Sequence, residues 1–514
     1  HGIVCYMAEG HPPPKSFNMG DLCLFPKDDT TLVSRTRPIT MNNFDNRIIA
    51  AAVSRTLMPA VDFLSEACQK GFINGRRGED NILAITNSFY TSLLEQKQKF
   101  FLFIDTAKAF DSIDHPFLFD VLKKVGMPTW VLHLVKGLMH EVQVRPRLGG
   151  RSKTLIDIKR GVKQGCPLSP LLFILAYDPL LTRLASMMGT DVFAFADDAV
   201  ISNENLSNIP KITKEIDDFG LVSGFGVNTE KSVLLRTMPT TPRDDDLLAH
   251  TGWDGLSFAS RATYLGVLMG VGVTTEDIYS KPYAKYEARL ITHRAALAHL
   301  PNQGKVHLFN IYLFSLFSYL FHFYVLPDKG MGEKIRAHAR QHIISFNGRA
   351  YKYMQLVAPK HNLGLSQPLR DPWAANLAAL ASQFDFSSVG SNPGEFVMIP
   401  GKHYLNNDDA RCPADLVDKA EWNTLLIGDH IASAALDIMN TLAPRDDDGH
   451  VDMTHYDVSK YKHKRKTLRR RLYKLALLAW QDDQIDDITT KLIRRDMNEG
   501  ITDAQNHEHT YALL

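Results

Sequence analysis

The chain contains 514 residues, of which 45% are hydrophobic and 22% are charged, so it is long enough for roughly two to four folded domains, and its composition argues against extensive disorder. Its 58 Lys and Arg residues nearly balance 57 Asp and Glu residues, and any nucleic-acid binding therefore has to come from local patches. The 5 cysteines contain no Cys-x-x-Cys pair, which argues against a disulfide framework or zinc knuckle and fits a reducing intracellular compartment.

The first half of the chain alternates helices with buried strands. Helical spacing of apolar residues predicts helices at residues 46–64, 80–96, 114–125, 130–140, 169–181 and 206–222. Phe100–Ile104 is a run of apolar residues, which is typical of a strand buried on both faces, and Asp105 follows it directly. Because the next helix has its own N-cap at Asp114, Asp105 is left free for chemistry.

Two Gly-containing segments lie between these helices. Residues 142–158 alternate apolar and polar side chains and predict a β-hairpin around Gly149 and Gly150. Residues 161–170 read GVKQGCPLSP and predict a loop ahead of an apolar helix. A loop whose backbone comes close to a substrate needs glycine, so this loop is a candidate substrate-binding element.

An acidic turn stands out at residues 191–202, which read DVFAFADDAVIS. Two short apolar runs flank Asp197 and Asp198, and this pattern predicts two strands joined by a tight turn. Adjacent carboxylates repel each other, so hairpin folding does not require them, whereas a hard cation such as Mg²⁺ needs oxygen ligands gathered at one point. Together with Asp105, the two acids predict a divalent metal site.

The second half of the chain is predominantly helical. Residues 237–257 form a polar insertion that we expect to be a surface loop, and residues 283–300, 306–326 and 332–344 are predicted helices. Residues 306–326 carry no formal charge, but their His, Asn and Ser side chains favour a buried helix over a membrane span. The chain begins at His1 without a leader, and we expect no secretory signal and a fragment of a longer polyprotein.

Five sequence strings together resemble a known family. FIDTAKAFDSIDH, GVKQGCPLSPLLFILAYDPL, FAFADD, GVNTEKS and ATYLGVLMG are similar to the successive palm motifs of reverse transcriptases, in the family's order. The amino-acid sequences of these motifs resemble the LINE-type branch of non-LTR retrotransposons, although the Gly-Gly-Leu motif of that branch appears here as Asn362-Leu363-Gly364-Leu365. The resemblance implies an RNA-directed DNA polymerase, a nucleotidyltransferase.

The resemblance also implies the fold and the domain order. We expect an α+β right-hand polymerase with fingers, palm and thumb and a helical C-terminal extension. The implied domains are an N-terminal lead-in at residues 1–19, fingers and palm at 20–274, a helical thumb at 275–330, a helical region at 331–386 and the C-terminal extension at 387–514.

Roles for individual residues follow from the family motifs. Asp105, Asp197 and Asp198 would hold two Mg²⁺ ions, or Mn²⁺ in their place, and Lys231 would protonate the leaving pyrophosphate. Lys27 and Arg37 would contact the triphosphate of the incoming dNTP. Phe110 would lie under its sugar, and Gln164 and Gly165 would contact the nucleotide and the templating base. The implied partners are an RNA template, a DNA primer and dNTPs, with no membrane.

A basic segment at residues 460–474 predicts a further nucleic-acid contact. It carries nine Lys or Arg side chains in fifteen residues without an acid, and its leucines predict an amphipathic helix. The residues expected to bind nucleic-acid backbone are Lys464, Arg465, Lys466, Arg469, Arg470 and Arg471. A nuclear-import signal is the alternative interpretation of this segment. We expect an intracellular protein that is nuclear, and cytoplasmic as a ribonucleoprotein.

Two alternative functions stay open. An RNA-dependent RNA polymerase shares the palm chemistry, and a catalytically silent polymerase fold would act as an RNA-binding scaffold. The complete set of acids, with Gln164, Gly165 and Lys231, argues against silence. The sequence does not identify the template RNA, the priming mechanism, an associated endonuclease or the oligomeric state.

Overall fold

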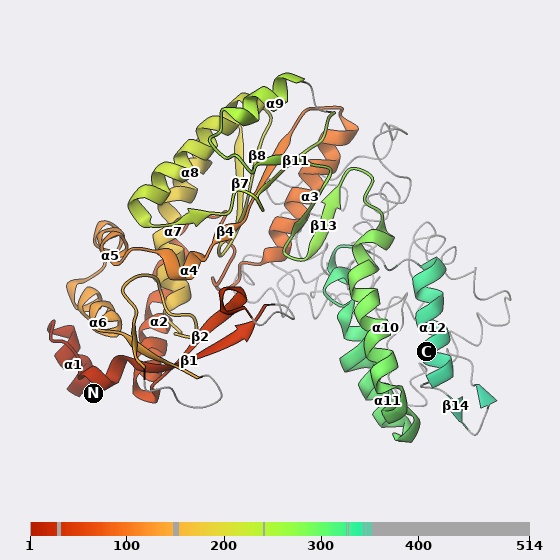
Figure 1. The fold of residues 1–514 in the computed structure, drawn as a ribbon, viewed down its shortest axis with the longest axis horizontal. Helices are drawn as coiled ribbons and strands as arrows, with labels where there is room; N and C mark the ends of the chain where they lie inside the picture. The colour runs from red at the N-terminus through yellow and green to blue at the C-terminus, as the bar shows by residue number, and fades with distance from the viewer. Residues whose placement is uncertain are drawn as a thin grey trace, which may run out of the picture. The chain divides into compact units, whose positions relative to one another are not determined.

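The computed structural model describes residues 2–27, 32–147, 154–239, 242–324, 326, 328–342, 345–346 and 349–350 (Figure 1). The chain divides into two compact units. Unit 1 comprises His1–Asn81 and Gln96–Leu265, and unit 2 comprises Ile82–Glu95 and Gly266–Leu514.

Unit 1 is built on a five-stranded sheet with the strand order β11-β10-β3-β8-β7. Its strands are β3 (Phe100–Ile104), β7 (Thr190–Phe195), β8 (Asp198–Asn203), β10 (Val233–Arg236) and β11 (Ser257–Ala259). The central strand β3 pairs antiparallel with β8 and β10, β7 pairs antiparallel with β8, and β10 pairs parallel with β11. Every residue of β3 is buried, which confirms the prediction of a strand covered on both faces.

Helices α7 (Ser169–Ala185) and α8 (Ile209–Ser223) pack with one face of this sheet (Figure 1). Strand residues Phe100, Leu102 and Ile104 share a hydrophobic core with the buried side chains of these helices. Because side chains alternate along a strand, Phe101 and Phe103 fall on the opposite face, where Phe103 contacts Tyr264. The sheet therefore has one face covered by α7 and α8 and an opposite face on which Phe103 meets Tyr264.

A second sheet in unit 1 has the order β2-β1-β5-β6. Its strands are β1 (Met19–Pro26), β2 (Thr36–Asn42), β5 (Gln143–Pro146) and β6 (Ile156–Asp157). Antiparallel pairing of Gln143 with Asp157 confirms the hairpin predicted at residues 142–158, whose tip lies outside the described residues. Further helices of unit 1 are α1 (Gly2–Ala8), α2 (Phe44–Leu64), α4 (Ala109–Ser112), α5 (His115–Lys124), α6 (Thr129–Met139) and α9 (Pro242–Ala249). Short strands are β4 (Thr106–Ala107), β9 (Gly226–Val227) and β12 (Arg261–Tyr264), and 3₁₀ turns span Lys15–Asn18, Val33–Arg35 and Leu206–Asn208.

The surface loop predicted at residues 237–257 is wrong, because this segment contributes helix α9 and buried side chains. Trp253 is 4% exposed, and its indole N–H donates to both carboxylate oxygens of Asp217 on α8, at 3.0 and 3.1 Å. Arg236 and Asp244 form a buried ion pair of 2.8 Å that attaches α9 to the sheet. A polar composition did not exclude burial here, because the polar groups find specific partners.

Unit 2 contains β13 (Val267–Gly270), α10 (Thr275–His299), α11 (Asn302–Leu308), α12 (Glu333–His342) and the short strands β14 (Ser345–Phe346) and β15 (Arg349–Ala350). It also includes residues 82–94 of α3 (Gly78–Leu94). Helix α10 begins eight residues earlier than predicted (275 against 283), because Thr274 and Asp277 form a capping box ahead of Pro282. Among the described residues, we find no helix long and apolar enough to cross a membrane.

The single helix predicted at residues 306–326 is also wrong. Helix α11 ends at Leu308 and is followed by a π-helical turn at Phe309–Leu313 and 3₁₀ turns at Phe314–Leu316 and Leu320–His322. Within this irregular segment, Phe317 packs against both Tyr279 and Tyr286 of α10.

Candidate active site

The three predicted catalytic acids lie at one end of the five-stranded sheet. In the β3–β8 pair Ile104 lies opposite Ala199, and the same register continued by one residue places Asp105 opposite Asp198. In the β7–β8 hairpin Phe195 lies opposite Asp198, which leaves Ala196 and Asp197 as a two-residue turn. Strand alternation puts Asp105 and Asp198 on the face opposite the α7–α8 layer.

The electrostatics of the site reflect the crowding of these carboxyl groups. Loss of hydration raises the pKa of Asp198, the negative charges of Asp197 and Asp105 add to that rise, and together they bring it to about 6. The hydroxyl of Thr106 donates a hydrogen bond of 3.2 Å to Asp197. This set of hard oxygen donors with mutually repelling charges suits a divalent cation, although within the described residues no group of three or more His, Cys, Asp or Glu side chains is arranged to hold a metal ion.

The loop that carries Lys231 is attached to the backbone of Asp105. Asn228 donates its N–H to the Asp105 carbonyl oxygen at 2.8 Å, and the Asp105 N–H donates to the Ser232 hydroxyl at 3.1 Å. Strands β4 and β9 continue this contact, with Thr106 opposite Val227. The Lys231 side chain itself is exposed.

Phe110 is held by two other aromatic rings. Its ring stacks on Phe173 of α7 with centroids 4.6 Å apart and an interplanar angle of 11°, and Phe72 meets it edge-on at 6.1 Å. Phe110 is half-buried. The predicted sugar-contacting residue is therefore fixed on one side by the core, with part of its surface left free.

The Gly-rich loop at residues 161–170 contacts both α4 and the β2 strand. The Gln164 carbonyl oxygen accepts a hydrogen bond of 2.8 Å from the Thr40 N–H. Gly165 has φ 103°, and a Cβ atom built there would lie 2.6 Å from the Thr40 carbonyl oxygen, so only glycine fits this position. The Gln164 side chain also approaches the Asp111 carboxylate at 3.4 Å.

Lys27 and Arg37 lie at the loop end of the β1–β2 hairpin. Arg37 pairs with Phe25 across the strands, and the Lys27 N–H donates to the Arg35 carbonyl oxygen at 3.0 Å. Both side chains are exposed. Burial raises the pKa of Asp111. The hydrogen bond from Gln164 and the positive charges of Lys108 and Lys27 oppose that rise, so the Lys27 charge stabilises the ionised carboxylate that Gln164 contacts.

Comparison with known proteins identifies the part of the chain that contains this site. Residues 25–269 match the family model "Reverse transcriptase (RNA-dependent DNA polymerase)". The retrovirus-related Pol polyprotein from the type-1 retrotransposable element R2 of Popillia japonica is 31% identical over 245 residues, which cover 45% of this chain and 34% of that protein. Residues 25–269 form a reverse transcriptase domain of the non-LTR retrotransposon type.

Other relatives match similar shares of the chain. The type-2 element R2DM polyprotein of Drosophila melanogaster is 28% identical over 226 residues, covering 42% of this chain and 21% of that protein. The uncharacterized 149 kDa protein of transposon TX1 from Xenopus laevis is 26% identical over 230 residues, covering 43% and 18%. The chain thus spans about a third or less of the length of these relatives.

A solved structure of apo telomerase from Candida Tropicalis is similar with a TM-score of 0.42 at 13% identity, covering 66% of this chain and 60% of that chain. The α+β class of the reverse transcriptase domain is confirmed by its own sheets and helices, and the acid-bearing strings FIDTAKAFDSIDH and FAFADD begin on strands β3 and β7 of the five-stranded sheet.

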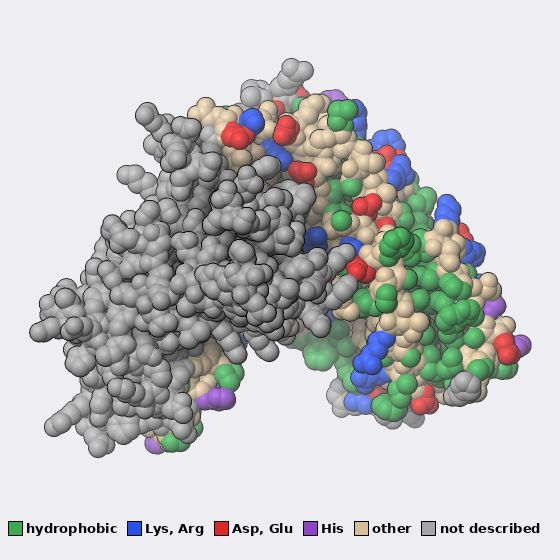
Figure 2. All heavy atoms as spheres, turned by 180° about the vertical axis from the view of Figure 1, so that it is seen from behind, with side chains coloured by type: hydrophobic (Ala, Val, Ile, Leu, Met, Phe, Trp, Pro, Cys, Tyr) green, Lys and Arg blue, Asp and Glu red, His purple; other side chains and the backbone are tan. Residues whose placement is uncertain are grey.

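The structure of the reverse transcriptase domain also reveals contacts that the sequence motifs did not predict. Gln69 donates to the Ala196 carbonyl oxygen in the acidic turn, Arg76 donates to the Gln69 carbonyl oxygen, and the Thr106 hydroxyl donates to Asp197. The predicted basic residues Lys464, Arg465, Lys466, Arg469, Arg470 and Arg471 lie outside the described residues. On the face seen in Figure 2, the described Lys and Arg side chains are interspersed with Asp and Glu.

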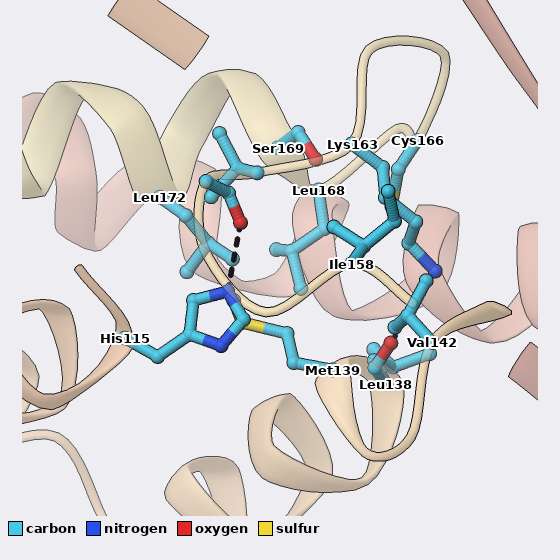
Figure 3. Close-up of a pocket in the computed structure, with 12 residues that line it drawn as sticks. His115, Leu138, Met139, Val142, Ile158, Lys163, Cys166, Leu168, Ser169 and Leu172 are labelled. Atoms are coloured by element: carbon cyan, nitrogen blue, oxygen red, sulfur yellow. Dashed lines mark hydrogen bonds between the residues drawn. The ribbon is translucent and has the colours of Figure 1, made fainter. Parts of the chain in front are cut away.

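A small pocket lies behind the Gly-rich loop of the domain (Figure 3). Its cavity of about 20 Å³ has room for one water molecule. In Figure 3 the His115 ring and the Lys163 amino group lie at opposite ends, and His115 bonds the Gly161 carbonyl oxygen at 2.9 Å. Lys163 is 9% exposed, its amino group meets the Leu138 carbonyl oxygen at only 3.4 Å, and burial lowers its pKa.

We expect Lys163→Met to raise the unfolding midpoint by about 2–4 °C at pH 7, because it removes a poorly compensated buried charge. The pKa of Lys163 is lower in the folded chain than its ordinary value of 10.5. The free-energy cost of burying the charged amine is therefore present at neutral pH, and it fades as the pH rises toward 10.5 and the amine loses its proton in both states. Thermal unfolding at pH 7 and pH 10 measures this difference. Lys159→Met, at an exposed position of the same segment, is the control and should change neither midpoint.

Proposed function

We propose that this chain copies RNA into DNA, as part of a protein encoded by a non-LTR retrotransposon or a related element. The observation that supports this function most strongly is the convergence of Asp105, Asp197 and Asp198 at one end of the sheet, within a segment that matches reverse transcriptases. Extension of a DNA primer annealed to RNA, with dNTPs and Mg²⁺, tests the proposal. Absence of extension by a folded protein would contradict it.

Asp105, Asp197 and Asp198 are the residues that would hold the metal ions. Their oxygen donors suit two Mg²⁺ ions, with Mn²⁺ as a substitute. Burial and then the charges of Asp197 and Asp105 raise the pKa of Asp198, and a cation would neutralise part of this negative charge. When bound, the ions would activate the primer 3′-hydroxyl and stabilise the displacement of pyrophosphate.

Residues of the chain itself would bind and orient the substrates. Lys27 and Arg37, at the loop end of the β1–β2 hairpin, would contact the triphosphate of the dNTP. Lys231 would supply a proton to the leaving pyrophosphate from a loop that is bonded to the Asp105 backbone.

A second group of residues would recognise the base and the sugar. Gln164 and Gly165 would contact the incoming nucleotide and the templating base, and the tight approach of Gly165 to Thr40 supports a fixed loop there. Phe110 would lie under the ribose, where its ring is braced by Phe173. These groups position the reactants, and positioning is a major part of the catalysis of nucleotidyl transfer.

The basic segment at residues 460–474 would bind the backbone of RNA or DNA. We expect replacement of Arg469, Arg470 and Arg471 by Gln to weaken binding of every sequence and to reduce the salt dependence of affinity by a slope of roughly 2–3. Fluorescence anisotropy across a salt series measures this slope. The control variant replaces Lys123, Lys211 and Lys214 by Gln in the same way; these lysines are exposed on α5 and α8. An unchanged slope in the first variant would favour the nuclear-import interpretation.

The same proposal includes the predicted division into fingers, palm, thumb and C-terminal extension. It also includes an intracellular location, in the nucleus and, as a ribonucleoprotein, in the cytoplasm. Both alternative functions keep this architecture. An RNA-dependent RNA polymerase would differ in its choice of sugar, and a silent scaffold would bind RNA without incorporating nucleotides.

A further inference from the structure

A short segment of unit 1 runs beside the acidic turn and bonds to it. The Lys70 N–H donates to the Ala194 carbonyl oxygen at 2.8 Å, and the Ala194 N–H donates to the Cys68 carbonyl oxygen at 3.1 Å. This pairing places Gln69 next to β7 as an additional parallel bridge. Gln69 has no exposed surface. The segment 68–71, named here the clamp segment, therefore reaches the end of β7 that leads into the Ala196–Asp197 turn.

The Gln69 side chain bonds both backbone polar groups of Ala196. Its Oε1 accepts from the N–H groups of Ala196 and Gly71, each at 2.8 Å, and its Nε2 donates to the Ala196 carbonyl oxygen at 3.1 Å. Only this orientation of the amide satisfies every partner. The turn residue that directly precedes Asp197 is thus held at two points by one buried amide.

The turn needs such support because Ala196 adopts a left-handed conformation. Its φ is 56°, a conformation that is unfavourable for a residue with a side chain. Gly71 lies so close that a Cβ atom built on it would be 2.2 Å from the Ala196 nitrogen. The turn is therefore fixed by contacts with the clamp segment rather than by the local preference of its own residues.

The clamp segment is itself anchored to the rest of unit 1. The Arg76 guanidinium donates to the carbonyl oxygens of Gln69 at 3.0 Å and Ser65 at 3.3 Å, and its Nε donates to the Asp62 carboxylate at 3.1 Å. The carboxylate of Asp178 on α7 accepts the Glu66 N–H at 2.7 Å. These bonds connect the clamp segment to α2 and α7, two helices of the hydrophobic core.

We propose that Gln69 is a positioning residue for nucleotidyl transfer, which fixes the Ala196–Asp197 turn so that the carboxylates of Asp197 and Asp198 face Asp105. The inference rests on the proposed function for its catalytic part. The inference also has a structural part, which is that Gln69 sets the geometry of the three acids. This geometry affects cation binding even without a nucleic-acid substrate. Gln69 acts through the turn and touches neither substrate nor reacting atoms.

The test replaces Gln69 by Met, which has a similar length and no hydrogen-bonding amide. We expect Gln69→Met to lower the kcat of primer extension at least tenfold while the KM for dNTP stays within about twofold, because substrate contacts lie elsewhere. We also expect Mn²⁺ binding to the protein without nucleic acid, followed by electron paramagnetic resonance of free Mn²⁺, to weaken three- to tenfold. Should the Met variant not fold, Gln69→Asn keeps the amide but is one methylene too short, and the same losses are expected.

The matched control is Asn81→Leu. Asn81 is also a buried amide, and it donates to the Ala194 carbonyl oxygen of the same strand at 2.9 Å and to the Tyr264 hydroxyl at 3.2 Å, but it does not bond the turn. We expect this variant to lose stability while kcat and Mn²⁺ binding stay near the wild-type values.

The inference would be overturned by wild-type kcat and Mn²⁺ affinity in Gln69→Met, or by equal losses in Asn81→Leu, which would indicate a general effect of destabilising β7. If the wild-type protein extends no primer, the proposed function fails, and the Mn²⁺ titration alone then decides whether Gln69 positions the acids.

Discussion

Asp197→Asn is expected to reduce the rate of primer extension at least ~10³-fold while leaving the protein folded. A metal-ligating carboxylate supplies several kcal/mol of transition-state stabilisation, and each 1.36 kcal/mol corresponds to a factor of ten in rate. The structure adds a second expectation. Because Asp197 and Asp105 raise the pKa of Asp198, neutralising Asp197 relieves repulsion, and the unfolding midpoint should be equal to or higher than that of the wild type.

Two further substitutions make this prediction specific. Asp105→Asn should be as damaging as Asp197→Asn, whereas Asp198→Asn should have a smaller effect, because we expect this acid to matter least. Asp191→Asn is the matched control. Asp191 lies on the same hairpin at the other end of β7, where it pairs with Lys99 at 2.9 Å, and its loss should leave extension near the wild-type rate. A folded Asp197→Asn protein with the wild-type rate would contradict the assignment.

The second large effect concerns the choice of sugar. Phe110→Val should raise the use of ribonucleotides relative to deoxyribonucleotides at least tenfold and leave dNTP incorporation largely intact. A Phe ring offers bulk without a hydrogen bond, so a 2′-hydroxyl placed against it either clashes or is buried unpaired at a cost of about 1–3 kcal/mol. The stacking on Phe173 and the edge contact with Phe72 prevent the ring from moving aside.

Phe110→Val also removes packing, and a control is needed for that loss. Phe117→Val removes the same atoms from a half-buried ring that packs against Phe219 on the helical side of unit 1. It should reduce stability to a similar degree without changing the ratio of ribonucleotide to deoxyribonucleotide incorporation. An unchanged preference for deoxyribonucleotides in Phe110→Val would contradict the role of Phe110 in excluding the 2′-hydroxyl and would favour the RNA polymerase alternative.

The secondary structure around the acids was predictable because its patterns are local. The uninterrupted apolar run of Phe100–Ile104 and the two apolar runs flanking Asp197 indicated buried strands, and the register of β3, β7 and β8 then brings the acids together. Helices with long apolar periodicity, such as α2 and α7, were predicted for the same reason. In each case a residue's position depends mainly on its own neighbours in the chain.

Other features depend on partners that sequence patterns do not reveal. The role of Gln69 arises from Ala196, which lies far along the chain, and a buried amide has no periodic signature. Residues 237–257 looked like a solvated loop because the burial of Trp253 depends on Asp217 of α8. Residues 306–326 looked like one helix because hydropathy does not show how Phe317 must fit between Tyr279 and Tyr286.

The most direct test of RNA-templated DNA synthesis is single-nucleotide incorporation opposite a defined base of an RNA template, measured for the purified wild-type protein with each of the four dNTPs and four NTPs in turn. We predict rapid addition of the complementary dNTP, with the complementary NTP at least tenfold slower and mismatched nucleotides slower still. Preferential addition of the complementary NTP, or no addition of any nucleotide by the folded protein in Mg²⁺, would contradict the account.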